Sequence, residues 1–244
     1  MNHCFFGVPQ DESYGWTVLE AVPDEVRGFY FYLGGEAEQL LTDFSTSPYP
    51  AELEVLAIGN SSFSIGKSLD YRGLIQGIGD AEFPNLRQLE LGVWELFSNS
   101  HCMYGKLGDV TRILRNSPKV EVLGLYGSFG IAEALSFACL KNLTILLEDN
   151  TTGVNGGFIE QPTLSNLLDS EFPHLEEAYI DLICEDDDYG YKFSEAFLNG
   201  ANLPKLKRLE IAGGFADQEK ERLLASPLGK RAGLILHHGE LSVS

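Results

Sequence analysis

The stretch Phe83-Pro84-Asn85-Leu86-Arg87-Gln88-Leu89-Glu90-Leu91-Gly92 contains the pattern Leu-x-x-Leu-x-Leu, and near copies of this pattern return along the chain. The closest copy starts at Pro204, and others start at Pro50, Pro118 and Pro173. Counted from the first apolar position, the units begin at Val26, Leu53, Leu86, Val120, Leu143, Leu175 and Leu206. The mean interval is about 30 residues, which is typical of stacked repeat proteins. The sequence therefore predicts a solenoid in which each unit packs on its neighbours.

Each copy of the pattern is expected to form a β-strand that is followed by a loop and a helix. Alternate residues of a strand point to opposite sides, so the apolar positions should face a core and the residues between them should face outward. Apolar residues recur at helical spacing in residues 36–44, 107–114, 131–138, 163–168, 194–198 and 217–224. Ser194 and Asp217 are expected to cap two of these helices, and Asn199-Gly200 to end one. Strand, loop and helix in repetition predict an α/β fold.

These units resemble the leucine-rich repeat superfamily, in the long, helix-bearing form that is similar to ribonuclease inhibitor and is found in compact bacterial cytosolic proteins. The resemblance covers roughly residues 24–236. It implies a horseshoe-shaped solenoid with a parallel β-sheet on its concave face and helices on its convex face. Residues 1–22 are expected to cap the open end of the first unit, and residues 23–244 to form about seven irregular units.

The chain departs from this family pattern in two ways. The asparagine or cysteine that usually follows the strand is replaced by Gly59, Gly92, Gly127 and Gly213. The unit at Leu143 continues with Thr-Ile-Leu-Leu-Glu, which places Glu148 where a buried residue belongs. We therefore expect a local shift of register in this unit, or an irregular turn.

The outward positions of the predicted strands combine tyrosines with carboxylates around an apolar middle. They are Tyr30, Tyr32, Val55, Ala57, Gln88, Glu90, Val122, Tyr126, Ile145, Leu147, Glu177, Tyr179, Asp181, Arg208 and Glu210. Tyrosine is enriched in protein interfaces and contributes strongly to binding. The residues expected to bind a partner are Tyr30, Tyr32, Glu90, Tyr126, Glu177, Tyr179, Asp181 and Glu210, with Asp186, Asp187 and Asp188 of an acidic loop. The alternative interpretation is that these are ordinary solvated positions.

Net charge separates the possible classes of partner. The chain has 36 Asp and Glu against 17 Lys and Arg, a formal charge of −19, so nucleic acid and anionic membrane are not expected as partners. Another protein with a basic face fits this charge, although the charge could serve solubility alone. No leader segment or membrane-spanning run is visible, and the four cysteines form no Cys-x-x-Cys pair. Free thiols in a cytoplasmic protein are therefore expected.

The sequence contains no recognisable catalytic constellation. The loop at residues 185–191 is acidic, but an EF-hand that starts at Asp186 would have Tyr191 where glycine is required. The histidines lack the spacing of a zinc site, and the glycine-rich stretches lack the ending of a phosphate-binding loop. We therefore expect no metal, no cofactor and no enzymatic activity. Loose binding of calcium by Asp181, Asp186 and Asp188 is the alternative for this loop.

The chain is accordingly expected to be a non-catalytic protein-protein interaction module. The resemblance to ribonuclease inhibitor, together with the negative charge, implies an inhibitor or an immunity-type protein for a basic partner as the most specific form of this role. Fold alone does not give function, so two alternatives stay open. One is a general scaffold or adaptor, and the other is a metal-dependent enzyme with its site in the acidic loops.

Overall fold

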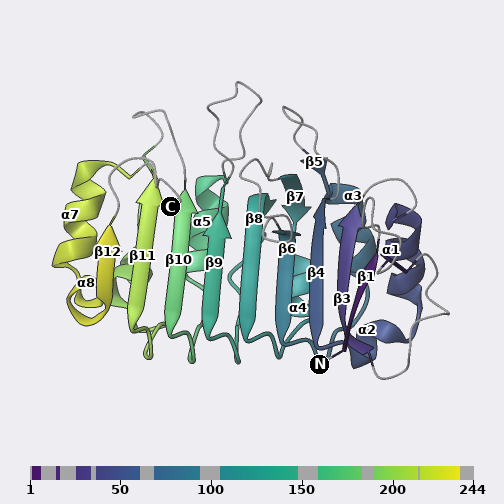
Figure 1. The fold of residues 1–244 in the computed structure, drawn as a ribbon. Coiled ribbons are helices and arrows are strands. Elements are labelled where there is room, and N and C mark those ends of the chain that lie inside the picture. The colour runs from purple at the N-terminus through teal and green to yellow at the C-terminus, as the bar shows by residue number, and fades with distance from the viewer. Residues whose placement is uncertain are drawn as a thin grey trace.

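A computed structural model describes residues 2–6, 15–16, 26–33, 37–60, 69–93, 105–147, 159–182, 190–213 and 215–236. These residues form an α/β fold around a 12-stranded sheet, whose main path follows the order β12-β11-β10-β9-β8-β6-β4-β3-β1-β2. All neighbouring strands that the structure describes are parallel. The sheet is open, and helices α3, α4 and α5 lie behind it in Figure 1. Helices α1 and α2 lie near one end of the sheet, and α7 and α8 lie near the other.

The elements have the following bounds. The strands are β1 (Asn2–Phe6), β2 (Gly15–Trp16), β3 (Val26–Leu33), β4 (Val55–Asn60), β5 (Leu69–Asp70), β6 (Gln88–Val93), β7 (Gly105–Asp109), β8 (Val122–Gly130), β9 (Asn142–Leu146), β10 (Glu177–Leu182), β11 (Arg208–Gly213) and β12 (Gly233–Leu236). The helices are α1 (Ala37–Thr46), α2 (Tyr49–Glu52), α3 (Arg72–Ile78), α4 (Thr111–Arg115), α5 (Gln161–Leu168), α6 (Glu195–Asn199), α7 (Asp217–Ala225) and α8 (Pro227–Arg231).

The leucines of the repeated pattern form the core, as the sequence predicts. Leu86, Leu89 and Leu91 are fully buried. Leu89 stands in register with Leu56 on one side and Leu123 on the other, so each inward position continues as an apolar row across the sheet. Burial of each such side chain contributes about 1.5–3 kcal/mol. This gain favours stacking of the units in register.

The unit around Leu143 starts three residues earlier than the sequence suggests. Leu143 pairs with Leu123 and Ala178, so it occupies the second apolar position of the pattern, and Leu140 occupies the first. Ile145 and Leu147 therefore point into the core, where both are buried. The prediction that these two residues face outward was wrong. The expected shift of register is real, and it gives the outward positions to Thr144 and Leu146.

One predicted helix is shortened by a strand, and another is absent. Residues 107–114 divide between strand β7, which buries Leu107, and the short helix α4. Residues 131–138 form no helix, and Ser136 instead makes a bridge to Glu171. Both segments present apolar residues at helical spacing, but Leu107, Ile131 and Phe137 reach the core from outside any helix. Spacing alone does not separate these cases.

The other helix signals correspond to helices in the structure. The Ser194 hydroxyl accepts a hydrogen bond of 3.1 Å from the backbone N–H of Phe197, and Gly200 ends α6 in a left-handed conformation. Helices α1 and α5 lie within two residues or so of the predicted ranges. Helix α7 is also present, but its N-cap is Ala216, and Asp217 is its first helical residue.

Gly127 marks the place where β8 leaves the main sheet. Residues up to Tyr126 pair with β9, whereas Gly127 onward pairs with β7 in a second, shorter ladder that includes β5. At Gly127, φ is 120°, and an added Cβ would stand 2.1 Å from the carbonyl oxygen of Gly105. Gly92 has the same constraint against the carbonyl of Tyr126. Glycine therefore occupies these turns because the neighbouring backbone leaves no room for a side chain.

A ladder of alternating charges runs along the edge of the sheet where the strands begin, which we call the start edge. Its members are Arg27, Glu54, Arg87, Glu121, Lys141, Glu176 and Lys207. The backbone N–H of each member after Arg27 donates to the carbonyl of the member before it over 2.7–2.9 Å. Glu121 forms ion pairs with Arg87 at 2.8 Å and with Lys141 at 2.5 Å. Glu176 forms one with Lys207 at 2.6 Å. Ion pairs at the start edge therefore stabilise the order of these strands, in addition to apolar packing in the core.

The first residues of the chain add two strands to the sheet beside β3, the strand of the first repeated unit. Strand β1 pairs with β3, and β2 pairs with β1. The role of residues 1–22 as a cap stays a prediction. Across the described ranges, no helix combines the length and the apolar character that crossing a bilayer requires.

Candidate functional site

The face of the sheet that turns away from α3, α4 and α5 carries the outward side chains, and we call it the front face (Figure 1). Its central row contains Tyr30, Ala57, Glu90, Gly124, Thr144, Tyr179, Glu210 and Ile235, which stand in register on successive strands. Tyr126, Leu146 and Asp181 form a second row beside it. The sheet thus brings together tyrosines and carboxylates that are far apart in the sequence.

The first polar cluster of the front face lies on β10 and β11. Tyr179 stands beside Glu210 in register, and its hydroxyl donates a hydrogen bond to the carboxylate of Asp181. Burial of the ring raises the pKa of Tyr179 to about 12, helped by the negative charges of Asp181 and Glu210. Arg208 donates to Glu210 over 2.6 Å. Because these side chains hold one another, the cluster presents a fixed arrangement of donors and acceptors.

The second polar cluster lies on β3 and β6. Burial raises the pKa of Tyr30, and the negative charge of Glu90 raises it further. Ala57 stands between these two residues on β4 and is buried. The side-chain amide of Gln88 donates to the Glu90 carboxylate over 2.5 Å. A tyrosine and a carboxylate are therefore close enough to interact here as well.

Tyr126 lies between the two clusters. An added Cβ on Gly124 would stand 2.6 Å from the Cε2 atom of the Tyr126 ring, so the ring lies over this glycine. Tyr126 is 7% exposed and Asp181 is 8% exposed, so both are more enclosed than the sequence suggests. Val55 and Ala57 have the predicted outward register and are buried too. The front face is therefore a packed surface rather than a layer of solvated side chains.

The remaining predicted site residues have different outcomes. Glu177 is exposed at the start of β10. Tyr32 belongs to β3, but its side chain is outside the described part of the chain. Asp186, Asp187 and Asp188 also lie outside the described residues, as does Glu148. Sequence reasoning missed Thr144 and Leu146. Starting this unit at Leu140 instead of Leu143 would have assigned both residues to the front face.

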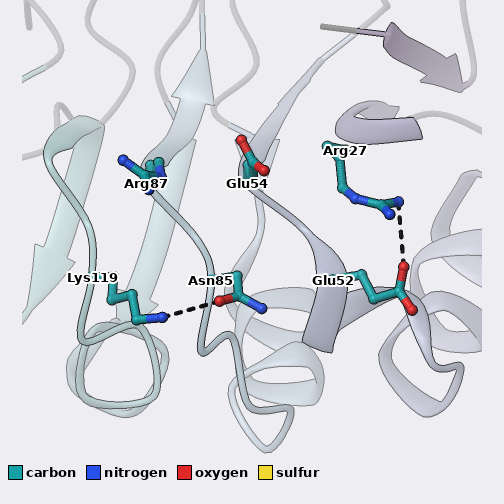
Figure 2. Close-up of a pocket in the computed structure, with 6 residues that line it drawn as sticks. All are labelled: Arg27, Glu52, Glu54, Asn85, Arg87 and Lys119. Atoms are coloured by element: carbon teal, nitrogen blue, oxygen red, sulfur yellow. Dashed lines mark hydrogen bonds and ion pairs between the residues drawn. The ribbon is translucent and has the colours of Figure 1, made fainter. Parts of the chain in front are cut away.

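The start edge contains a second candidate, a polar hollow of about 330 Å³. It is lined by Arg27, Glu52, Glu54, Asn85, Arg87 and Lys119. Figure 2 shows the ion pair between Arg27 and Glu52, at 3.3 Å, and the hydrogen bond from Lys119 to Asn85, at 3.1 Å. Arg87 is engaged by Glu121. Most of these groups already pair with a residue of a neighbouring unit, so they are less available to a ligand. The front face is therefore the stronger candidate.

Metal and thiol chemistry would need clustered ligands or an activated cysteine. Nowhere in the described ranges do three His, Cys, Asp or Glu side chains gather as a set of metal ligands. Cys139 is a half-buried free thiol in the turn before β9. Hydrogen bonding, aromatic contact and charge are the chemistry that the front face offers.

Comparison with known proteins concerns the fold. No family model matches the chain, and no curated protein matches it significantly. A crystal structure of a protein from Bacteroides fragilis is similar, with a TM-score of 0.54 and 19% sequence identity over 87% of this chain. The chain spans 59% of the length of that protein. At this identity the similarity supports the α/β fold and carries no statement about function.

Proposed function

We propose that the chain is a non-catalytic, cytoplasmic protein-binding module of the leucine-rich repeat type, and that its front face holds a basic partner protein. The repeated pattern, the parallel strand order and the apolar rows between units support the repeat family. A horseshoe with its concave face toward the partner is the form that this family would give. An inhibitor or immunity-type role is the most specific version of the proposal, and a scaffold would use the same face.

The observation that carries this proposal is the pairing of tyrosine with carboxylate on the front face. Tyr179 is held by Asp181, and Tyr30 lies within electrostatic reach of Glu90. Interfaces favour rigid tyrosines because their large contact area costs little conformational entropy on binding. Side chains that are already fixed in the free protein lower this cost further. The front face is therefore preorganised for binding in the free protein.

Charge sets the expected chemistry of the partner. Glu90, Asp181 and Glu210 lie on the front face of a chain whose formal charge is −19. An acidic surface attracts a basic protein at long range and raises the association rate. Lysine and arginine side chains of the partner would then reach the carboxylates, while its apolar groups contact the tyrosine rings.

Affinity capture from the native host tests this proposal. The wild-type protein is compared with a variant that combines Tyr179→Ala and Glu210→Gln. The control is Glu160→Gln, which removes an exposed carboxylate at the N-cap of α5. We expect a basic protein that is retained by the wild type and by the control but lost by the front-face variant. Equal retention by all three proteins would place binding elsewhere.

A further inference from the structure

Among the described residues, one arrangement of side chains occurs twice on the front face. On β6, the side-chain amide of Gln88 donates to the Glu90 carboxylate over 2.5 Å. On β11, the guanidinium of Arg208 donates to the Glu210 carboxylate over 2.6 Å. In both cases the donor precedes the carboxylate by two positions, so the two side chains lie on the same side of their strand.

The two arrangements are also equivalent in register. Gln88 and Arg208 belong to one row across β6, β8, β9, β10 and β11, and Glu90 and Glu210 belong to the next row. Four strand steps separate β6 from β11 in the sheet order. At about 4.8 Å for each step, the two carboxylates lie about 19 Å apart along the row.

The two donors differ in charge. Gln88 is neutral, so its hydrogen bond leaves the negative charge of Glu90 in place. Arg208 is cationic, so its ion pair compensates the charge of Glu210. Only 14% of the Glu210 side chain is exposed. A cation from a partner would therefore have to displace Arg208 in order to reach this carboxylate.

We propose that the two donors determine where a partner's cation binds on the front face, namely at Glu90 rather than at Glu210. This inference rests on the function proposed above and specifies the partner further. The partner presents a lysine or an arginine to the β6 end of the face and an uncharged part to the cluster on β10 and β11. The reversed orientation is disfavoured, because it would bring the partner's cation against Arg208.

An exchange of the two donors tests this proposal without changing the net charge. The exchanged protein combines Gln88→Arg with Arg208→Gln, which moves the cation from β11 to β6. The probe is a labelled tri-arginine amide peptide, whose extended backbone of about 10 Å is shorter than the distance between the two carboxylates. Its affinity is measured by fluorescence polarisation at an ionic strength of about 20 mM, where surface charges are weakly screened.

The wild type and the exchanged protein should depend on different carboxylates. In the wild type, Glu90→Gln should weaken binding by about tenfold and Glu210→Gln by about threefold, because only the first removes the carboxylate that contacts the peptide. In the exchanged protein this order should reverse, because the cation then compensates Glu90 and leaves Glu210 to the peptide. Thermal melts of each variant show that the proteins compared are folded.

The single variant Arg208→Gln provides a second test. It should strengthen binding by about threefold, because the charge of Glu210 is no longer compensated. Arg115→Gln is the matched control, since it also removes an exposed arginine from an ion pair with a glutamate, Glu133. It lies on α4, behind the sheet, and should alter the affinity by no more than about twofold (Figure 1).

Two results would overturn this proposal alone. They are retention of the wild-type order in the exchanged protein, and equal gains of affinity in Arg208→Gln and Arg115→Gln. Neither result would remove the front face as the binding surface, since Glu90→Gln and Glu210→Gln would still weaken binding. Unchanged affinity in both of these carboxylate variants would instead place the peptide elsewhere, and would contradict the proposed function together with this inference.

Discussion

The ring of Tyr126 lies over Gly124, two residues earlier on strand β8, in the middle of the front face. A Cβ on residue 124 would stand 2.6 Å from Cε2 and 2.9 Å from the hydroxyl oxygen of this tyrosine. A residue without a side chain is therefore required for the ring to lie flat on the sheet. This contact places an aromatic surface between the two polar clusters.

Gly124→Ala should displace the Tyr126 ring and leave the fold intact. The methyl group collides with the far end of a side chain rather than with the backbone, so the ring can swing outward at a cost of about 1 kcal/mol. We expect a slightly lower Tm and a larger accessibility of tyrosine to a soluble fluorescence quencher. Thr144→Ala, in the same row on β9, is the control and should leave the quenching unchanged. An unaltered Tyr126 environment in Gly124→Ala would contradict the contact.

The corrected position of the Leu143 unit predicts opposite effects for two adjacent residues. Ile145 is fully buried, so Ile145→Asp should destabilise the protein by more than about 3 kcal/mol or prevent folding. Leu146 faces outward and is half-buried, so Leu146→Asp should cost much less. Urea denaturation of both variants measures the difference. A larger loss for Leu146→Asp would restore the outward assignment of Ile145.

The charge ladder predicts that Glu121→Lys is worse than Glu121→Gln. The lysine would stand between Arg87 and Lys141 and create three like charges in a row, whereas glutamine only removes the two ion pairs. The difference should be about 1 kcal/mol in the free energy of unfolding. Glu221→Lys on the exposed side of α7 is the control for net charge. Equal stability of the two Glu121 variants would show that the ladder does not contribute.

Acid should weaken the same ladder. The hydrogen bond from Lys141 lowers the pKa of Glu121, and the hydrogen bond from Lys207 lowers the pKa of Glu176. A carboxylate with a lowered folded-state pKa stabilises the protein above its unfolded pKa, and this contribution is lost as the pH falls through the folded value. Thermal melts of the wild type should therefore lose stability below about pH 4.5 more steeply than melts of Glu121→Gln. Parallel curves would argue against the ion pairs in solution.

Tyr179 should ionise later than an unperturbed tyrosine. Its pKa is raised to about 12, against an ordinary value near 10, because the ring is half-buried beside Asp181 and Glu210. The stabilisation is present below the unfolded pKa and is lost as the pH rises through the folded one. A near-ultraviolet titration of wild type and Tyr179→Phe should show the missing tyrosine in the late part of the curve. Loss from the early part would contradict the burial.

The apolar pattern was sufficient to predict the strands that begin near Val26, Leu53, Leu86, Val120, Leu175 and Leu206, whereas β1, β2, β5 and β7 lie outside it. Leu86, Leu89 and Leu91 are buried as expected, because spacing along a strand determines which side a residue faces. The start of the Leu143 unit was missed because several apolar residues follow one another there, so spacing alone allows two registers. Of the helix expected at residues 107–114, only the second half is helical, for a similar reason. Short apolar segments can fill a core from a strand or from a helix.

The candidate site was only partly visible in the sequence. Tyr179, Asp181 and Glu210 were identified from alternation, but the burial of Asp181 and Tyr126 depends on neighbours that pairing brings together. The charge ladder was missed because its members lie one unit apart and alternate in sign.

Surface-plasmon kinetics on the captured basic partner test the central claim, that the front face is the binding site. Tyr179→Ala should speed dissociation by about tenfold, because buried aromatic contacts set the residence time. Glu210→Gln should slow association at low salt and have little effect at high salt, since it removes long-range attraction. Glu160→Gln, at the N-cap of α5, should change neither rate by more than about twofold. Unchanged kinetics in Tyr179→Ala and Glu210→Gln would contradict the front-face site.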